Sequence, residues 1–401
     1  MSITERYKKI PLLTKLFVGM ALGVILGLVM GKGATVVEPI GTIFLNLLKM
    51  AALPLIIFNL ISGICALDDP KIFGRVGGKI MIYYTATTAV AMVIGIAVAT
   101  IVSPGTGFVL QGQYKGAIQK IPSLGETVIN LIPTNIFTAL SQGKFDQIVI
   151  FSAFCGIAIL MLNQEDRLYM AEVTGKIAKM FNRMIGMVMM VAPFGVFALM
   201  ATTVGKYGSM LVGFVAKYIG ATYIAIIIMV CIYLILLFLF TGRSPIEFLK
   251  KAAPLMVTTA STSSSLACVP VSLECADSLG VSRSISSFTI PLGSQVNKDG
   301  NGIMLSLAVL FAAQAIGVDM PLATLVKVVF LGLILTTGAG GVPGSGIVSI
   351  AILIDAFGLP LEVVGIIAGI FALIDMGLTT LNCLGDLVGT VIVANSEKKV
   401  L

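Results

Sequence analysis

The chain contains no histidine, and only 11% of its 401 residues are charged. Soluble domains carry about 25% charged residues, so this shortage of charge argues against a soluble protein. The six cysteines form no CxxC pair and lie within or beside apolar segments. Without histidine and without paired cysteines, neither a zinc site nor a disulfide framework is expected.

The sequence is rich in long apolar runs. Hydrophobic residues make up 57% of the chain, mean hydropathy is +1.05, and several apolar runs exceed the length of about 18 residues that spans a bilayer. The first run, residues 11–30, follows a basic stretch but is too long for the apolar core of a signal peptide, so a retained helix is expected. The net charge of +7 is assigned to cytoplasmic loops rather than to nucleic-acid binding. The sequence therefore predicts an all-α polytopic membrane protein.

The loops predict how the chain crosses the membrane. The second, fourth and sixth gaps between the first apolar spans carry lysine and arginine more densely than the other gaps, which indicates a cytoplasmic N-terminus. Later charges continue the alternation and place the C-terminus inside as well. Short loops suggest a bacterial inner (plasma) membrane. The spans predicted to cross the membrane are residues 11–31, 36–67, 80–103, 147–163, 181–204, 210–240, 285–316, which contains the break "NKDGN", and 361–394.

Two other apolar segments are interrupted by small residues. Residues 253–280 contain "STSSSLACVP" and residues 320–358 contain "TTGAGGVPGSG". A break at membrane depth frees backbone groups that lipid cannot satisfy, so each segment is predicted to be a re-entrant hairpin buried in protein. Broken helices of this kind are typical of transporters, where half-helix ends bind charged groups. An alternative is that glycine and proline only kink ten ordinary membrane helices, which would leave both termini on the same side.

The last span carries polar residues on one face. Asp375, Thr379, Asn382 and Asp386 are spaced by 4, 3 and 4 residues, so they share one side of a helix. A carboxylate in the membrane interior costs at least a few kcal/mol and usually marks a substrate or ion path. The alternative is that these groups only bond neighbouring helices to one another.

Four motifs carry a resemblance to a known family. "STSSSLACVP", "NKDGN", "GAGGVPGSG" and "DMGLTTLNCLGD" occur in the family's order and spacing between Thr258 and Asn395. With "YYTATTAV" at residues 83–90 and "APFGVFALMA" at 192–201, the chain resembles the dicarboxylate/amino acid:cation symporters, which transport glutamate and neutral amino acids.

The resemblance implies eight transmembrane helices plus two re-entrant helical hairpins in an elevator-type homotrimer. It divides the chain into a scaffold, residues 1–79 and 111–207, and a transport domain, residues 80–110 and 208–401. The second hairpin would be the gate, because its small residues allow the backbone to hinge and to approach a ligand. The implied gate residues are Gly338, Gly340, Gly341, Pro343 and Gly344.

The resemblance also implies a substrate site. Asp375 would hold the α-amino group, while Asn382 and Ser265 would donate to the α-carboxylate, with a neighbouring serine of the tip open as the exact donor. Leu378 stands where acidic-substrate members have an arginine, and leucine offers neither charge nor hydrogen bond. Serine, threonine or alanine is therefore the expected class of substrate. The remaining contacts implied are Asn301, Thr379, Val342 and Gly346.

Lys298 is the largest departure from the family pattern, which has a methionine there. Burying its ammonium requires a partner, with Asp299 and Asp386 as candidates. We hypothesise that Lys298 acts as a tethered cation that replaces sodium at one site or at all, with proton coupling as a further option; alternatively it is a bystander and any sodium binds at Asn297, Asp299 and Asp386. The residues matched to cation sites are Tyr84, Thr87, Thr88, Gly293, Gln295, Asn297, Asp299, Asn382 and Asp386.

An intramembrane enzyme and an ion channel are the two other classes of function to compare with the sequence. An intramembrane enzyme would need a nucleophile with a base, and the sequence contains no such motif, so no catalytic residue is assigned. An amino-acid-gated anion channel is a further alternative, although a channel would not require Asp375. The expected partners are a small neutral amino acid, membrane lipid and two further copies of the chain, with no cofactor beyond a coupling proton or sodium ion and no nucleic acid.

Overall fold

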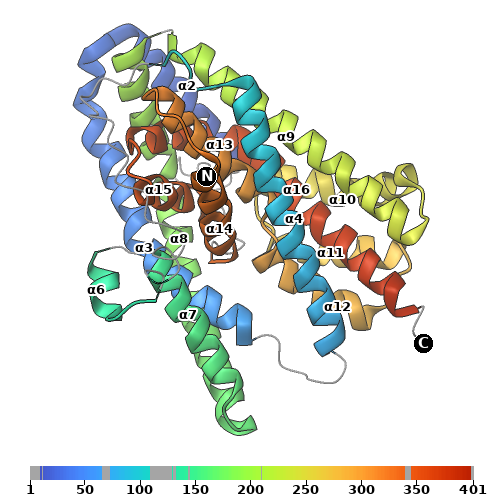
Figure 1. Ribbon diagram of the computed structural model, residues 1–401. Coiled ribbons are helices and arrows are strands. Elements are labelled where there is room, and N and C mark those ends of the chain that lie inside the picture. The colour runs from blue at the N-terminus through green and yellow to red at the C-terminus, as the bar shows by residue number, and fades with distance from the viewer. Residues whose placement is uncertain are drawn as a thin grey trace, which may run out of the picture.

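The computed structural model describes residues 10, 12–65, 73–108, 129, 132–142, 145–208, 210–338 and 345–398. Within these residues every regular element is a helix (Figure 1). In chain order the elements are α2 (Leu12–Met30), η1 (Gly31–Val37), α3 (Glu38–Cys65), α4 (Phe73–Val102), α6 (Ile136–Ser141), α7 (Phe145–Leu160), α8 (Gln164–Tyr207), α9 (Met210–Thr241), α10 (Pro245–Thr262), α11 (Val269–Ser278), α12 (Arg283–Val296), α13 (Asp299–Ala315), α14 (Leu322–Gly338), α15 (Ser345–Ala356) and α16 (Glu362–Lys398).

Several of these helices are long and apolar enough to cross a membrane. Among the described residues five such spans are found: Thr14–Phe44, Arg75–Val102, Gln164–Tyr207, Gly213–Thr241 and Glu362–Glu397. The predicted all-α polytopic membrane protein is thereby confirmed. The number of crossings and the re-entrant course of the hairpins stay predictions.

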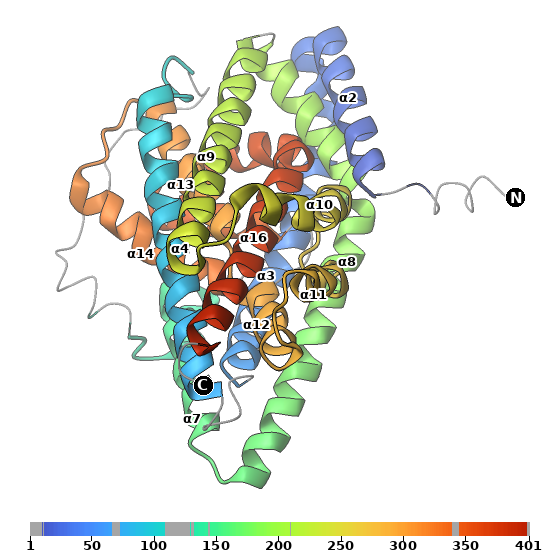
Figure 2. The same ribbon diagram turned by 90° about the vertical axis from the view of Figure 1, so that its right-hand side faces the viewer.

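Helix α2 packs closely against α8 through glycines spaced four residues apart. A Cβ atom added at Gly19 would lie 2.4 Å from the carbonyl oxygen of Pro193, and one added at Gly23 would lie 2.4 Å from that of Phe197. Small residues at this spacing let two membrane helices approach until their backbones touch. Helix α3 also packs along α8; in Figure 2, α2 and α8 run along the right-hand side of the molecule and α3 lies nearer its middle.

The core lies around α13 and α16. Nearly every residue of α13 is buried, and α16 packs against both α9 and α13. A helix that is apolar all round and has no exposed face belongs in the interior of a large protein. The two helices at the centre of the core also carry many of the predicted polar residues.

The first predicted interruption appears as a helix end. Helix α10 ends at Thr262, its C-cap Ser263 has φ 48° in the left-handed region, and α11 begins at Val269. Residues 285–316, read from the sequence as one crossing with a break, form two helices, α12 and α13. Asn297 and Lys298 separate these helices, because both have non-helical backbone angles.

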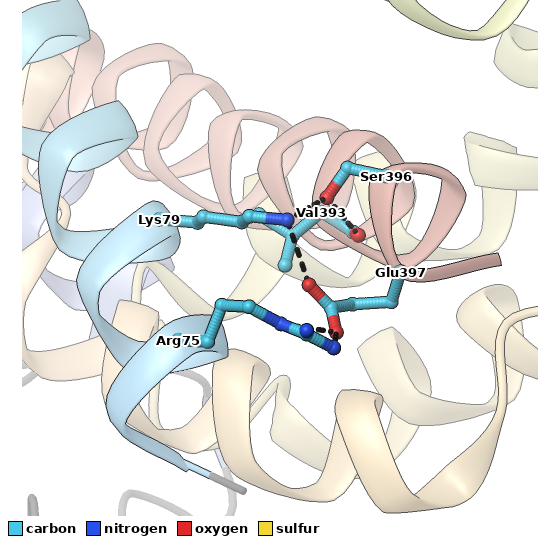
Figure 3. A network of polar contacts seen from close by, with 5 residues as sticks. All are labelled: Arg75, Lys79, Val393, Ser396 and Glu397. Carbon is cyan, nitrogen blue, oxygen red and sulfur yellow. Dashed lines mark hydrogen bonds and ion pairs between the residues drawn. The ribbon is translucent and has the colours of Figure 1, made fainter. Parts of the chain in front are cut away.

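An ionic cluster ties the start of α4 to the end of α16 (Figure 3). The Glu397 carboxylate accepts hydrogen bonds from Arg75 and, at 2.7 Å, from the Lys79 ammonium, which also donates to Ser396 Oγ at 2.9 Å. Both cations are partly exposed, so the cluster contributes modestly to stability. The ionic cluster holds the start of α4 in contact with the end of α16.

Candidate functional site

The break between α12 and α13 faces the middle of α16. The Gly300 amide donates to Asn382 Oδ1 at 2.7 Å, and the Asn297 side-chain amide donates to the Asn382 carbonyl at 3.2 Å. The first bond satisfies the Gly300 amide, which the break leaves without a helical partner, as burial in the membrane interior requires. Asn382 therefore fixes the geometry of the break.

The backbones of α13 and α16 are in close contact at Gly300, so this position has no room for a side chain. A Cβ atom at this position would lie 2.4 Å from the carbonyl oxygen of Leu378 in α16. We expect Gly300→Ala to push α13 off α16 and to destabilise the protein by about 1–3 kcal/mol, the usual cost of overpacking. Thermal unfolding of the purified protein measures this loss.

Gly220→Ala is the matched control for this substitution. Gly220 lies within α9, and a Cβ atom there would meet nothing within 4 Å. Alanine is the better helix former, so this variant should unfold at or slightly above the wild-type temperature. Equal unfolding temperatures for the two variants would contradict the close contact at Gly300.

Asp299 is enclosed by hydroxyl groups. Thr88 Oγ1 donates to Asp299 Oδ1 at 2.5 Å, and the Tyr233 hydroxyl donates to Asp299 Oδ2. All three side chains are buried. The resemblance placed Thr88 and Asp299 among the cation-site residues but did not include Tyr233, because one tyrosine in the long apolar run of α9 gives no signal by spacing.

Asp386 has a different environment. Asp386 Oδ1 and Asn297 Oδ1 are buried and accept no hydrogen bond from the part of the chain that the structure describes. Tyr84 lies beside them: a Cβ atom at Gly293 would be 2.5 Å from the Tyr84 hydroxyl and 2.6 Å from Asp386 Oδ1. Since the Tyr84 hydroxyl donates its proton to the Thr289 carbonyl at 2.9 Å, it presents only lone pairs to the others. Three oxygens, Asp386 Oδ1, Asn297 Oδ1 and the Tyr84 hydroxyl, thus offer lone pairs here, and oxygen ligands of this kind suit a cation.

Lys298 supplies a positive charge next to this cluster. Its side chain is 1% exposed, and its ammonium donates to the Ser294 carbonyl at 2.6 Å. Among the described residues no carboxylate oxygen lies within 4 Å of the ammonium, and the strongest attraction on it comes from Asp386. A buried ammonium without a close carboxylate is costly, so its interaction with Asp386 matters.

The polar face of α16 is buried along its length. Asp375, Thr379, Asn382 and Asp386 are each 9% exposed or less, and Thr379 Oγ1 donates to Asp375 Oδ1 at 3.2 Å. Because Asn382 Oδ1 accepts the Gly300 amide, Asn382 Nδ2 faces the other way. Asp375 thus presents an acceptor and Asn382 a donor, which are the groups that an amino acid's ammonium and carboxylate require.

The serine tip of hairpin one contains a second residue that the sequence did not single out. Ser265 is buried at the tip. The Ser263 hydroxyl is also buried, yet it has no partner among the described residues. Ser263 therefore joins Ser265 as a donor at the tip. A run of serines in sequence does not reveal which hydroxyl is already bonded.

The other predicted site residues are distributed as follows. Leu378 and Asn301 are buried, Gln295 is partly exposed, and Thr87 bonds to the Tyr84 carbonyl within α4 at 3.2 Å. Gly338 ends α14, and Gly346 lies buried in α15. The predicted cover and gate positions Gly340, Gly341, Val342, Pro343 and Gly344 lie outside the described residues. Within the described ranges, no three His, Cys, Asp or Glu side chains are grouped to hold a metal ion.

Comparisons with known proteins agree with this architecture. The model of the "Sodium:dicarboxylate symporter family" matches residues 12–396. The "Proton/sodium-glutamate symport protein" of Geobacillus stearothermophilus is 31% identical over 97% of this chain and 95% of its own length. The "C4-dicarboxylate transport protein" of Bacillus subtilis is 30% identical over 94% and 91%, and the "Proton/glutamate-aspartate symporter" of Escherichia coli is 29% identical over 98% and 94%.

The chain is a member of the sodium:dicarboxylate symporter family. It is therefore a multi-pass membrane transporter and not an enzyme, as the sequence predicted. The relatives named above differ in the substrates that their names give, and at about 30% identity they do not define the substrate of this chain.

Proposed function

We propose that this protein transports small neutral amino acids such as serine, threonine or alanine across a bacterial plasma membrane. The observation that carries the proposal is the absence of a buried guanidinium among the described residues, where every arginine is at least partly exposed. An acidic side chain in the closed site would lack a bidentate partner, and Leu378 offers none. A neutral substrate has no such requirement.

The substrate lies between α16, the start of α13 and the serine tip. Asp375 takes the ammonium, while Asn382 Nδ2 and the hydroxyls of Ser263 and Ser265 take the carboxylate. Thr379 and Asn301 are the polar contacts left for a hydroxylated side chain. The segment around Val342 and Gly346 covers the ligand as a gate.

Transport follows an elevator mechanism in a homotrimer. The scaffold comprises residues 1–79 and 111–207, and the transport domain comprises residues 80–110 and 208–401, with both termini in the cytoplasm. Arg75 and Lys79 of α4 bond to Glu397 of α16, although the boundary at residue 79 would place them in the scaffold. Because α4 begins at Phe73, these bonds support a boundary before that residue, with the whole of α4 in the transport domain.

Lys298 acts as a cation that is covalently part of the protein. Its ammonium lies at the Ser294 carbonyl, next to Gly293 and the acceptor cluster, and is attracted most strongly by Asp386. A fixed ammonium carries the charge of one sodium ion and donates to the same kind of oxygens. Transport then has a reduced sodium requirement or none, and a proton gradient becomes an alternative driving force.

Leu378→Arg tests the substrate class. The added guanidinium would pair with a substrate's side-chain carboxylate, so we expect aspartate or glutamate uptake to appear and serine uptake to fall by about tenfold or more, the effect of 1.4 kcal/mol. Uptake of labelled serine and aspartate into proteoliposomes measures both. Leu378→Met conserves volume and should keep the neutral preference. Wild-type uptake of aspartate in preference to serine would refute the proposal.

A sodium-coupled symporter of neutral amino acids is the second candidate. Two observations favour it: Asp386 Oδ1 and Asn297 Oδ1 have no donor among the described residues, and the Geobacillus stearothermophilus relative is named a proton/sodium symport protein. In that case Lys298 is a bystander and sodium lies between the two oxygens. Serine uptake that stops when choline replaces sodium would favour this candidate.

A further inference from the structure

The two buried carboxylates near the break, Asp299 and Asp386, differ in the hydrogen-bond donors that reach their oxygens. Asp299 has a hydroxyl donor on each oxygen, one from α4 and one from α9. The Asp386 carboxylate bonds to the Asn297 side chain, but Asp386 Oδ1 and Asn297 Oδ1 have no donor in the described part of the chain. A cation bound by oxygens needs unshared lone pairs facing it. The acceptor cluster at Asp386 meets this condition, and Asp299 does so much less well.

Tyr233 is held in place by packing as well as by its hydrogen bond. It is 1% exposed, and its ring lies over Gly385 of α16, where a Cβ atom would be 2.5 Å from the Tyr233 hydroxyl. The same added atom would be 2.7 Å from Asn297 Nδ2. Gly385 thus leaves room for the tyrosine, and the hydroxyl lies between Asp299 and the break.

We propose that the Tyr233 hydroxyl takes the place of an ion at Asp299 and confines cation binding to the cluster of Asp386, Asn297 and Tyr84. Tyr233 is a positioning residue: it holds the Asp299 carboxylate toward α9 and occupies the side from which an ion would approach. The inference deepens the proposed coupling scheme and rests on it, since Lys298 serves Asp386 while Tyr233 serves Asp299.

Tyr233→Phe removes the donor and little else. Asp299 Oδ2 is then buried without a partner, and a small cation is the group that satisfies it at least cost. We expect the melting temperature of the variant to rise with sodium concentration until it saturates, and to stay constant when choline replaces sodium. The reason is that a ligand that binds only the folded state stabilises it. Serine uptake should become stimulated by sodium about tenfold.

Tyr218→Phe is the matched control. Tyr218 is equally buried on the same helix, but its hydroxyl donates to the Met304 carbonyl at 3.3 Å and not to a carboxylate. This variant should respond to sodium as the wild type does. If the two variants show the same sodium response, the role given to Tyr233 is wrong.

Asp299→Asn gives a second test that does not require the phenylalanine variant to fold. We expect one of two results for the rise in melting temperature that sodium causes. Either the wild type shows no such rise, or the rise persists in Asp299→Asn and is lost in Asp386→Asn. Stabilisation that Asp299→Asn alone abolishes would overturn the inference. Because melting is followed without substrate, this result is independent of whether the transported molecule is a neutral amino acid.

Discussion

Lys298→Met is expected to make serine uptake depend on sodium. Removing the ammonium leaves Asp386 buried with no positive charge beside it, and breaking such an arrangement costs about 3–5 kcal/mol. Sodium bound among Asp386, Asn297 and Tyr84 would offset this cost. In sodium-free buffer we expect uptake to fall by about 100-fold or more, and saturating sodium should restore most of it. Uptake into proteoliposomes at increasing sodium concentration measures the effect.

Lys327→Met is the matched control for this experiment. Lys327 is also a buried lysine, 7% exposed, but it belongs to α14 and not to the break between α12 and α13. Its replacement should leave the cation requirement of the wild type unchanged. A cation requirement that is the same in Lys298→Met and in the wild type would show that the lysine at the break is a bystander.

Asp375→Asn is expected to abolish uptake of every amino acid. The substitution keeps the size of the side chain and removes the charge that would pair with the α-ammonium group. In a closed, buried site the unpaired ammonium costs about 3–5 kcal/mol, which corresponds to a loss of about 100-fold or more in affinity. Substrate binding to the purified protein, followed by calorimetry, measures this loss without requiring transport.

Asp355→Asn serves as the control for Asp375→Asn. Asp355 is exposed near the end of α15, so the change removes one negative charge without touching the buried face of α16. Its affinity for serine should equal that of the wild type. If Asp375→Asn also binds serine normally, the ammonium is held elsewhere and the assignment of α16 as the substrate helix is wrong.

Much of this arrangement follows from local patterns. The spacing of Asp375, Thr379, Asn382 and Asp386 places them on one face of any regular helix, and all four are buried on α16. The first small-residue interruption marks the end of α10, because an apolar helix does not continue through the serine run. Periodicity and composition are enough for features that depend on neighbours along the chain.

Other features depend on which helices meet in space. Tyr233 and Asp299 are 66 residues apart in sequence, and nothing in the apolar run of α9 indicates that one tyrosine reaches a carboxylate. The orientation of the Asn382 amide is set by Gly300, again on another helix. Helix α8 also extends further than the predicted span of 181–204: it begins at Gln164, with Asn163 as its N-cap and a Glu172–Lys176 pair on its exposed first half. Hydropathy alone does not register a polar extension of this kind.

The most direct test of the account is uptake of labelled serine into proteoliposomes that contain the purified wild-type protein, with sodium, potassium or choline as the only external cation and with or without a pH gradient. The account predicts saturable serine uptake that is the same with all three cations, and the pH gradient then separates proton coupling from exchange. Uptake that requires sodium would contradict the role of Lys298 as a built-in cation.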